Sequence, residues 1–347
     1  MASEATSVGA RGHRARASAS PRFVGPMVWF ILYLGQSLIG VALARFRRGP
    51  LRATWTFGYE VVTRAQKRFH ERVARLGPAE ERRAWDSLKA QNPSSKRVTW
   101  TRSRFGGVDC IDISPHERKA PERVILYLHG GGFLYGSEHS HGELCSRIAI
   151  SGGARLVFPL YRLAPEHPFP AALEDALSVY RALREAEGHR SEIVVAGDSA
   201  GGNLAVALLL SLRDRGDALP VRGALISPCV DLADRSGSMQ YNEPFDWASP
   251  WMFDRWQREY LADQAPAAPL ASPARADLRG LPPLLIQIGT AEMLYDQVKA
   301  FARRAEEAGV EVTLAECADR VHLWHALAPM FREFQASIEQ IGGYLAS

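Results

Sequence analysis

The chain has 347 residues, of which 46% are hydrophobic and 23% are charged, and its formal net charge at pH 7 is +4. These values are ordinary for a folded soluble protein, and a chain of this length can bury a large core without disulfides or metals. The four cysteines lie far apart without Cys-x-x-Cys spacing, which argues against a disulfide framework or a cysteine metal site. Arginines are frequent near the N-terminus, but no nucleic-acid motif accompanies them, so we expect no nucleic-acid partner.

The N-terminal part of the chain contains two segments of different character. Residues 1–22 are rich in Ala, Ser, Gly and Arg without an apolar period, which predicts a disordered tail. Residues 23–44 carry no charge and have the length of a membrane-spanning helix. Three interpretations of this segment stay open: an uncleaved membrane anchor, an amphipathic helix that covers the folded domain, and a cleaved signal peptide. Because arginines flank the segment on both sides, its orientation is not predicted, and the protein is expected to be membrane-associated or cytoplasmic.

The remaining chain alternates between helical and strand patterns. Residues 54–90 show a helical, strongly charged pattern, and two alternating runs at 98–104 and 108–114 predict a β-hairpin. Short apolar runs then alternate with helical segments. The predicted strands are 124–128, 156–160, 193–196, 224–227, 284–288 and 312–316, and the helices begin near His141, Pro170, Gly202 and Asp296, with a last one after Leu323.

This alternation predicts an α/β fold, in which a mostly parallel sheet is flanked by helices on both faces. Residues 235–275 interrupt the pattern, because they are rich in Pro and Trp and contain no clear strand. We therefore expect an insertion there. No internal repeat is visible in the sequence.

Residues 197–201 read Gly-Asp-Ser-Ala-Gly and match the pattern G-x-S-x-G. They lie between a predicted buried strand and a predicted helix, which is the context that a nucleophilic serine needs. A tight strand-to-helix turn exposes the hydroxyl of Ser199, and the flanking glycines let the two backbones approach closely. The start of the helix adds partial positive charge near a developing oxyanion. A structural Gly-Ser turn is the alternative.

Residues 129–133 read His-Gly-Gly-Gly-Phe and directly follow the first parallel strand. Acyl transfer passes through a tetrahedral intermediate with an anionic oxygen, and glycine N–H groups can approach that oxygen without interference from side chains. A phosphate-binding loop would need a GK[ST] or GxGxxG pattern, and neither is present. Together with Ser199, this motif predicts a serine hydrolase.

On these motifs, and on the segment Tyr-Arg-Leu-Ala-Pro-Glu-His-Pro at residues 161–168, the sequence resembles the hormone-sensitive-lipase-like esterases, also called the GDXG lipolytic family. The resemblance extends from about Arg97 to the C-terminus. It implies an α/β-hydrolase catalytic domain over 97–347, with a helical cap built from the N-terminal helices of 45–96 and the insertion at about 235–275. Asp198 is expected to be a structural hydrogen-bonding residue.

In this fold the catalytic residues follow the order Ser, then Asp or Glu, then His. The family pattern places an acidic residue shortly before the catalytic Asp, and on that match Asp296 is the acid and Glu292 is a supporting residue. The base of the family precedes a short residue pair, here Leu-Trp, so the resemblance implies that His322 is the base. His325 is interpreted as a helix residue.

The resemblance also implies that the N–H groups of Gly131, Gly132 and Ala200 form the oxyanion hole. No metal or organic cofactor is expected. We predict the hydrolysis of short- to medium-chain carboxylic esters, with a small-molecule ester as substrate. An amide or N-acetyl hydrolase with the same residues is the chemical alternative, and a non-catalytic small-molecule receptor is the alternative of another class. The oligomeric state is not predicted.

An aromatic cluster in the insertion has two interpretations. It either builds an apolar acyl pocket or forms the hydrophobic core of the cap itself. The cluster consists of Tyr241, Phe245, Trp247, Trp251, Phe253, Trp256 and Tyr260.

Overall fold

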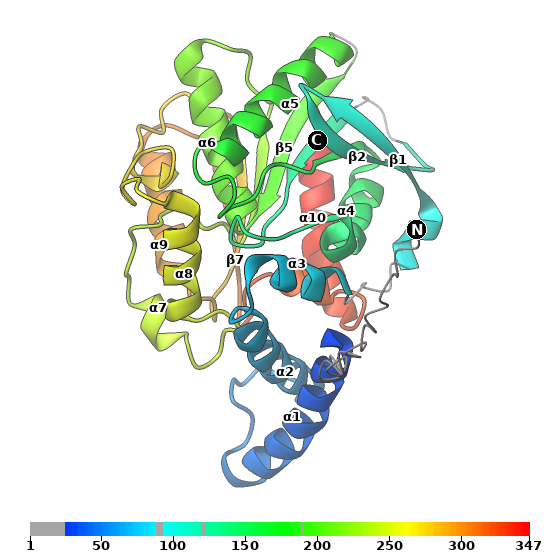
Figure 1. Ribbon diagram of the computed structural model, residues 1–347, viewed down its shortest axis with the longest axis vertical. Coiled ribbons are helices and arrows are strands. Elements are labelled where there is room, and N and C mark those ends of the chain that lie inside the picture. Colours follow the sequence, from blue (N-terminus) through cyan, green and yellow to red (C-terminus); the bar gives the residue numbers. More distant parts are fainter. Residues whose placement is uncertain (1–24, 88–92, 119–122, 189–190) are drawn as a thin grey trace, which may run out of the picture.

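The structure, a computed structural model, describes residues 25–87, 93–118, 123–188 and 191–347. The tail predicted for residues 1–22 lies outside these ranges. The described residues form one eight-stranded sheet with the strand order β1-β2-β4-β3-β5-β6-β7-β8 (Figure 1). The strands are β1 (Val98–Phe105), β2 (Val108–Pro115), β3 (Arg123–Leu128), β4 (Arg155–Pro159), β5 (Glu192–Asp198), β6 (Gly223–Ile226), β7 (Leu284–Gly289) and β8 (Val312–Cys317).

The sheet is parallel except at one edge. The hairpin strands β1 and β2 pair antiparallel with each other, and β2 pairs antiparallel with β4, whereas all later neighbours are parallel. Every residue of β3 and β7 is buried, as expected for parallel strands that are covered on both faces. The predicted hairpin, strands and α/β fold are therefore confirmed.

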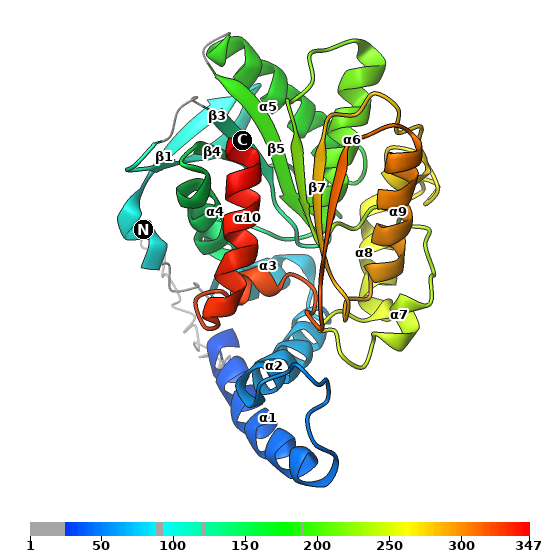
Figure 2. The ribbon, with the colours of Figure 1, turned by 180° about the vertical axis from the view of Figure 1, so that it is seen from behind.

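Helices cover both faces of the sheet. Helices α5 and α6 contact each other on the face turned to the viewer in Figure 1, and α10 packs against α4 on the face seen in Figure 2. Helix α9 packs against β7 and β8. The bounds of these helices are α4 (Glu138–Gly152), α5 (Ala171–Glu187), α6 (Ala200–Arg215), α9 (Tyr295–Glu307) and α10 (Gln335–Ala346).

Two further groups of helices lie outside the sheet and its covering helices. The first group precedes the sheet in the chain and consists of α1 (Pro26–Arg48), α2 (Phe57–Val73) and α3 (Pro78–Ser87). The second group lies in the predicted insertion and consists of α7 (Ser238–Tyr241) and α8 (Pro250–Leu261). Residues of α2, α3 and α8 line cavities at Ser199, directly after β5. These helices therefore cover the carboxyl ends of the parallel strands, where ligands bind in open α/β sheets.

Helix α1 contains the uncharged segment and continues into three arginines, Arg45, Arg47 and Arg48. Among the described residues it is the one helix that is long and apolar enough to cross a membrane. It packs against α2 and projects from the body of the molecule at the bottom of Figures 1 and 2. Only 17% of its most apolar window is buried.

Candidate active site

The candidate nucleophile sits on a sharp turn between β5 and α6. Ser199 has φ 51° and ψ −117°, a backbone conformation that is strained for a residue with a side chain. A Cβ atom on Gly201 would collide with the carbonyl oxygen of Leu128 on the neighbouring strand. Only glycine therefore lets the start of α6 come so close to β3, and this close approach is what presents Ser199 at the end of the sheet.

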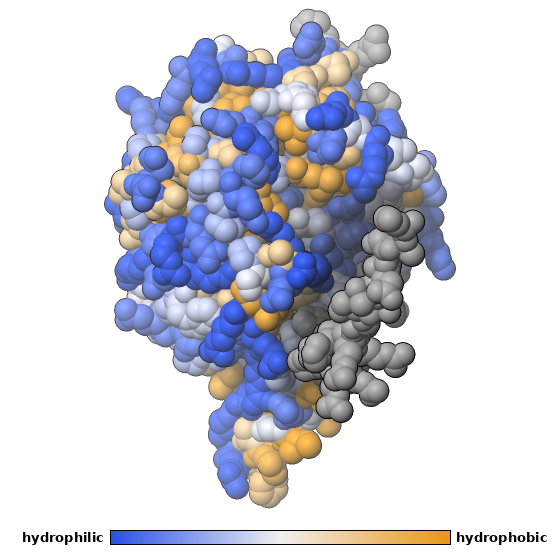
Figure 3. All heavy atoms as spheres, in the orientation of Figure 1, coloured by the Kyte–Doolittle hydropathy of each residue, from blue (hydrophilic) through white to orange (hydrophobic). Residues whose placement is uncertain are grey.

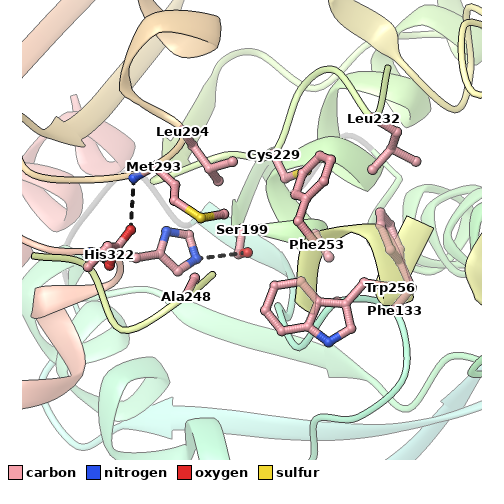
Figure 4. A pocket seen from close by; sticks show the side chains of 13 residues that line it. Phe133, Ser199, Cys229, Leu232, Ala248, Phe253, Trp256, Met293, Leu294 and His322 are labelled. Atoms are coloured by element: carbon pink, nitrogen blue, oxygen red, sulfur yellow. Dashed lines mark hydrogen bonds between the residues drawn. The ribbon is translucent and has the colours of Figure 1, made fainter. Parts of the chain in front are cut away.

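His322 lies beside Ser199, after the end of β8. Its Nε2 atom is 2.9 Å from Ser199 Oγ, as drawn in Figure 4. Its Nδ1 atom is 2.8 Å from Glu292 Oε2. A carboxylate oxygen can only accept, so Nδ1 carries a proton and a neutral ring leaves Nε2 free to accept the proton of the serine. The structure thus joins Ser199, His322 and Glu292 in one chain of hydrogen bonds.

Asp296, the acid that the resemblance implies, is hydrogen-bonded to other residues, and Glu292 takes the place beside this histidine. Asp296 lies in the first turn of α9, where its carboxylate accepts hydrogen bonds from the backbone N–H of Ser238 and the hydroxyl of Tyr241, at 2.8 and 2.7 Å. Glu292 comes three residues after the end of β7 and is fully buried. Glu292, which is closer to the carboxyl end of β7, therefore contacts His322. Asp296 lies in α9 and points to Ser238 and Tyr241 instead.

Glu292 is held firmly in this position. Its second oxygen, Oε1, accepts from the backbone N–H of Gly289 at 2.6 Å and from the hydroxyl of Ser227 at 2.8 Å. Burial raises the pKa of the Glu292 carboxyl, and its bond to His322 lowers it only in part. These bonds fix the direction of the remaining oxygen toward His322.

The charge balance of the site also affects His322. Burial alone would lower the pKa of its ring. The hydrogen bond and the charge of Glu292, and then the charges of Asp246 and Asp198, reverse this effect and raise the pKa above its ordinary value. The pair is therefore built to stabilise an imidazolium, which is what a general base becomes when it accepts a proton.

Asp246 is a buried residue that the sequence did not point to. One of its oxygens accepts from the backbone N–H of His322 at 3.0 Å, and the other accepts from that of Met293 at 2.8 Å. The neighbouring Trp247 donates its indole N–H to the carbonyl oxygen of His322 at 2.7 Å. Both residues thus hold the loop of the histidine, and Asp246 ties it to the loop of Glu292. Asp246 lies in an irregular segment without periodicity, so no sequence pattern could have marked it, whereas Trp247 belongs to the aromatic cluster noted in the sequence.

The glycine motif forms a loop beside the nucleophile. Gly131 has φ 112°, and a Cβ atom there would collide with the carbonyl oxygen of Tyr135. Ala200 is the first residue of α6, so its N–H has no partner within the helix. Within the described ranges, the N–H groups of Gly131, Gly132 and Ala200 donate no hydrogen bond to another protein group. All three donors remain free for an oxygen at the reacting carbon.

Asp198 fastens this loop to the sheet, in keeping with the structural role expected for it. It is fully buried, and its Oδ1 atom accepts from the hydroxyl of Tyr127 at 2.7 Å and from the backbone N–H of Gly130 at 3.0 Å. Burial would raise its pKa, but His141 and these hydrogen bonds lower it. A buried anion therefore positions the glycine loop relative to β5.

His325 does not take part in this network. It is fully buried, and its Nε2 atom lies 2.6 Å from Gln287 Oε1. Burial lowers its pKa to about 3, so the ring is neutral at ordinary pH. It lies in a short 3-10 helix over Trp324–Leu327, which matches its interpretation as a helix residue.

Two cavities meet at Ser199 and His322. The first, of about 400 Å³, is drawn in Figure 4 and is lined mainly by apolar side chains, among them Phe133, Leu232, Phe253, Trp256 and Leu294. The second, of about 750 Å³, adds polar groups from outside the motifs, namely Gln66 and His70 of α2, and Ser140 and His141 of α4. The site therefore offers an apolar side and a more polar side to the two halves of a substrate.

The aromatic cluster divides between its two interpretations. Phe253 and Trp256 line the first cavity, and Trp247 and Trp256 line the second. Tyr260 is fully buried and stacks on Phe133 with 3.6 Å between ring centroids, so it belongs to the core. Tyr241 and Trp251 are exposed. Trp247 and Phe253 are also buried in the hydrophobic core, so these two residues serve both the pocket and the core.

Known proteins are similar to this chain in sequence and in fold. Residues 125–326 match a family described as the α/β hydrolase fold (Abhydrolase_3). An acetyl-hydrolase of Streptomyces hygroscopicus is 43% identical over 228 residues, which are 64% of this chain and 75% of that protein. An esterase of Acinetobacter venetianus is 35% identical over 239 residues, which are 68% of this chain and 78% of that protein.

The crystal structure of an esterase from the bacterial hormone-sensitive lipase family has a TM-score of 0.75 and 34% identity to this chain, with 91% of this chain and 97% of that chain covered. Family, relatives and fold agree with the motifs from which the serine was first singled out. This chain belongs to the α/β-hydrolase fold family and is a carboxylic ester hydrolase of its hormone-sensitive-lipase-like branch.

Proposed function

We propose that this esterase hydrolyses short- to medium-chain carboxylic esters with Ser199 as nucleophile, His322 as general base and Glu292 as the acid that orients it. The observation that carries the proposal is the continuous hydrogen-bond chain from Ser199 Oγ through His322 to Glu292. The backbone N–H groups of Gly131, Gly132 and Ala200 are proposed as the oxyanion hole.

The first half of the reaction transfers the acyl group to the enzyme. His322 Nε2 takes the proton of the Ser199 hydroxyl while Oγ attacks the ester carbonyl carbon. The carbonyl oxygen becomes an oxyanion and accepts hydrogen bonds from the glycine loop and the start of α6. The bond between carbon and the leaving oxygen then breaks, and His322 gives its proton to that oxygen, so the alcohol departs.

The second half restores the enzyme. Water enters in place of the alcohol, and His322 takes one of its protons as the oxygen attacks the acyl carbon. The bond to Ser199 Oγ breaks, the serine recovers its proton from His322, and the carboxylic acid is released. Glu292 stays ionised in both halves and stabilises the imidazolium each time.

The two cavities supply the proposed subsites. The apolar cavity, bounded by Phe253, Leu232 and Leu294, suits the acyl chain. The cavity beside α2 suits the alcohol part of the ester, because His70 lines this cavity and offers a hydrogen-bond acceptor. His70 Nδ1 is 2.7 Å from the carbonyl oxygen of Gln66, and burial lowers the pKa of the ring to about 3, which leaves Nε2 as an acceptor.

A panel of p-nitrophenyl esters of increasing chain length, together with aryl acetamides, tests this function. We expect kcat/KM to be highest for short or medium acyl chains and to fall for long ones, because large side chains such as Phe253 and Trp256 bound the apolar cavity. Amide hydrolysis should be slower throughout. The acetyl-hydrolase of Streptomyces hygroscopicus makes deacetylation the second candidate, and a sharp preference for acetyl over butyryl groups would favour it. A maximum at long chains would contradict the proposal.

The pH dependence of the reaction should reflect the environment of His322. The base acts only when its ring is neutral, and Glu292 raises the pKa of the ring, so kcat/KM should rise with pH through a value above about 6.5. Glu292→Gln should move this limb to lower pH, because the charge that raises the pKa is gone. The measurement is kcat/KM between acid and weakly basic pH for both proteins. A limb well below the ordinary histidine value in the unmodified enzyme would contradict the assignment.

Attachment to a membrane through residues 23–44 is the second part of the proposal. It is supported by the length and hydropathy of α1 and by its low burial, since the core helix of a soluble protein would be mostly enclosed. A signal segment meets the same length and hydropathy test.

A further inference from the structure

Helix α1 turns an unbroken apolar face to solvent. Its exposed side chains recur at spacings of three and four residues, which places them on one side of the helix. This outer face consists of Met27, Val28, Ile31, Leu32, Leu38, Ile39, Leu43 and Phe46, with Gly35 and Ala42 between them. Exposed fractions reach 63% at Ile39 and 93% at Phe46. Figure 3 shows apolar atoms at the lower tip of the molecule, where Figure 1 places α1.

Several polar side chains of α1 contact α2 and do not lie on the outer face. Arg45 and Arg48 both donate to Glu60 of α2, at 2.8 and 2.7 Å, and the Glu60 side chain is completely buried. Ser37 is buried, and Gln36 accepts from Arg68 at 3.1 Å. The inner side also carries Trp29, Phe30 and Tyr33, which pack against residues of α2 and α3, so α1 is apolar on both sides. A helix on the surface of a soluble protein turns polar side chains outward instead. The arrangement of α1 fits a helix whose outer side meets an apolar medium.

These inward contacts decide how α1 can meet a membrane. A spanning helix would have to leave α2, which would strip the buried carboxylate of Glu60 of both arginine partners. Leaving one buried charge without its partners is strongly unfavourable. If α1 stays on α2, only its outer face can enter lipid. Because the inner side is held by α2, the exposed apolar side can enter lipid only if the helix lies in the plane of the interface.

The charges around the outer face favour an anionic surface. Arg47 is exposed at the end of α1, and Arg68, Arg72 and Arg75 are exposed along the groove between α1 and α2, with Glu71 as the acidic residue among them. We call these four arginines the arginine rim. A second copy of this chain would bring the same positively charged rim and so lacks the complementary negative charge. Anionic head groups supply it, while their acyl chains cover the apolar side chains.

We propose that α1 lies flat in an anionic lipid surface, with its outer face among the acyl chains and the arginine rim at the head groups. The inference rests on the proposed membrane attachment and specifies its geometry and its lipid. The alcohol-side cavity of the active site is lined by Gln66 and His70 of α2, the helix against which α1 packs. The arrangement therefore places this cavity close to the lipid surface and suits esters dissolved in the membrane.

Flotation of the full-length protein with vesicles tests the proposal. Binding to vesicles of phosphatidylcholine mixed with phosphatidylglycerol should exceed binding to pure phosphatidylcholine and should weaken with salt. The double variant Ile39→Gln, Phe46→Gln should bind the mixed vesicles at least about tenfold more weakly, because it loses two apolar side chains that would enter the lipid. The control double variant Val221→Gln, Met330→Gln alters two exposed apolar residues elsewhere and should bind like the unmodified protein.

Orientation is read from single cysteines at Gly25→Cys and Arg47→Cys, which lie at the two ends of α1 outside its outer face, with the unmodified protein as background. With protein added to sealed vesicles, an impermeant thiol reagent outside should label both ends if the helix lies flat. Protection of one end only would show a spanning helix and overturn the proposal. No binding to mixed vesicles, or equal losses in both double variants, would also overturn it, as would a dimer that the outer-face variant converts to monomer.

Activity on a water-soluble short ester separates this inference from the proposed function. Residues 39 and 46 lie outside the site, so both double variants should keep the rate of the unmodified enzyme. Lost vesicle binding with intact activity would support the lipid surface. An inactive enzyme that still binds vesicles would contradict the proposed chemistry and leave the membrane geometry standing.

Discussion

Ser199→Ala should lower kcat on p-nitrophenyl butyrate by about 10⁶-fold, the loss typical of removing the nucleophile or base of a triad. In the proposed reaction the acyl group is transferred to Ser199 Oγ, which the variant lacks. The oxyanion donors and the two cavities remain in the variant. A fluorophosphonate should label the unmodified enzyme at Ser199, as mapped by mass spectrometry, and should not label the variant. Ser178→Ala on the surface helix α5 serves as a matched control and should leave kcat unchanged.

His322→Ala should cause a loss of the same order, and the double variant should lose little more, because the two residues act as a unit. His325→Ala provides the comparison. It removes a buried partner of Gln287, so it should lower the melting temperature while kcat stays close to normal. Loss of kcat in a folded His325→Ala protein, with His322→Ala still active, would reverse the assignment of the base.

Glu292→Gln should lower kcat by about 10⁴-fold, the effect of an amide in place of the orienting carboxylate in a triad. Glutamine cannot stabilise the imidazolium, and its NH₂ group can hold the ring in the wrong tautomer. Asp296→Asn should stay within about tenfold of the unmodified rate, because its bonds to Ser238 and Tyr241 lie outside the proton path. Steady-state kinetics of both variants, with circular dichroism to check folding, distinguishes the two acids.

The opposite pattern, a large loss for Asp296→Asn and a small one for Glu292→Gln, would show that the family match is correct and the hydrogen-bond geometry misleading. Equal large losses would point to a role for Asp296 in holding the loop before α9. In that case the pH dependence of kcat/KM distinguishes the two carboxylates. Glu292→Gln should shift the rise in activity to lower pH, and Asp296→Asn should not, because Glu292 is the one of the two that raises the pKa of the His322 ring.

The sequence alone was sufficient to predict those features that depend on the local conformation of the backbone. The glycines around Ser199, the glycine loop at residues 129–133 and the alternating strands and helices all predict what the structure contains. Each of these features is decided by neighbours within a few residues, because a tight turn needs glycine and a doubly covered strand needs a continuous apolar run.

The choice between Glu292 and Asp296 depended on where the chain stops extending from β7 and begins to coil into α9. Both are acidic residues near the same strand, and the spacing pattern favoured Asp296, whereas Glu292 is the one that contacts His322. Helix boundaries are set by packing of the helix on the sheet, and a shift of a few residues changes which carboxylate points at His322. Asp246 could not be predicted for a related reason, since its partners lie 47 and 76 residues away in the chain.

Residues 23–44 show the same division most clearly. Their composition established that the segment is long, uncharged and apolar, and this left an anchor, a cap helix and a signal segment open. Only the tertiary structure shows which side of α1 is occupied, because the ion pairs of Arg45 and Arg48 with Glu60 join positions 12 and 15 residues apart on two different helices. Hydropathy averages over all sides of a helix, whereas contact with α2 assigns each side to protein or to solvent.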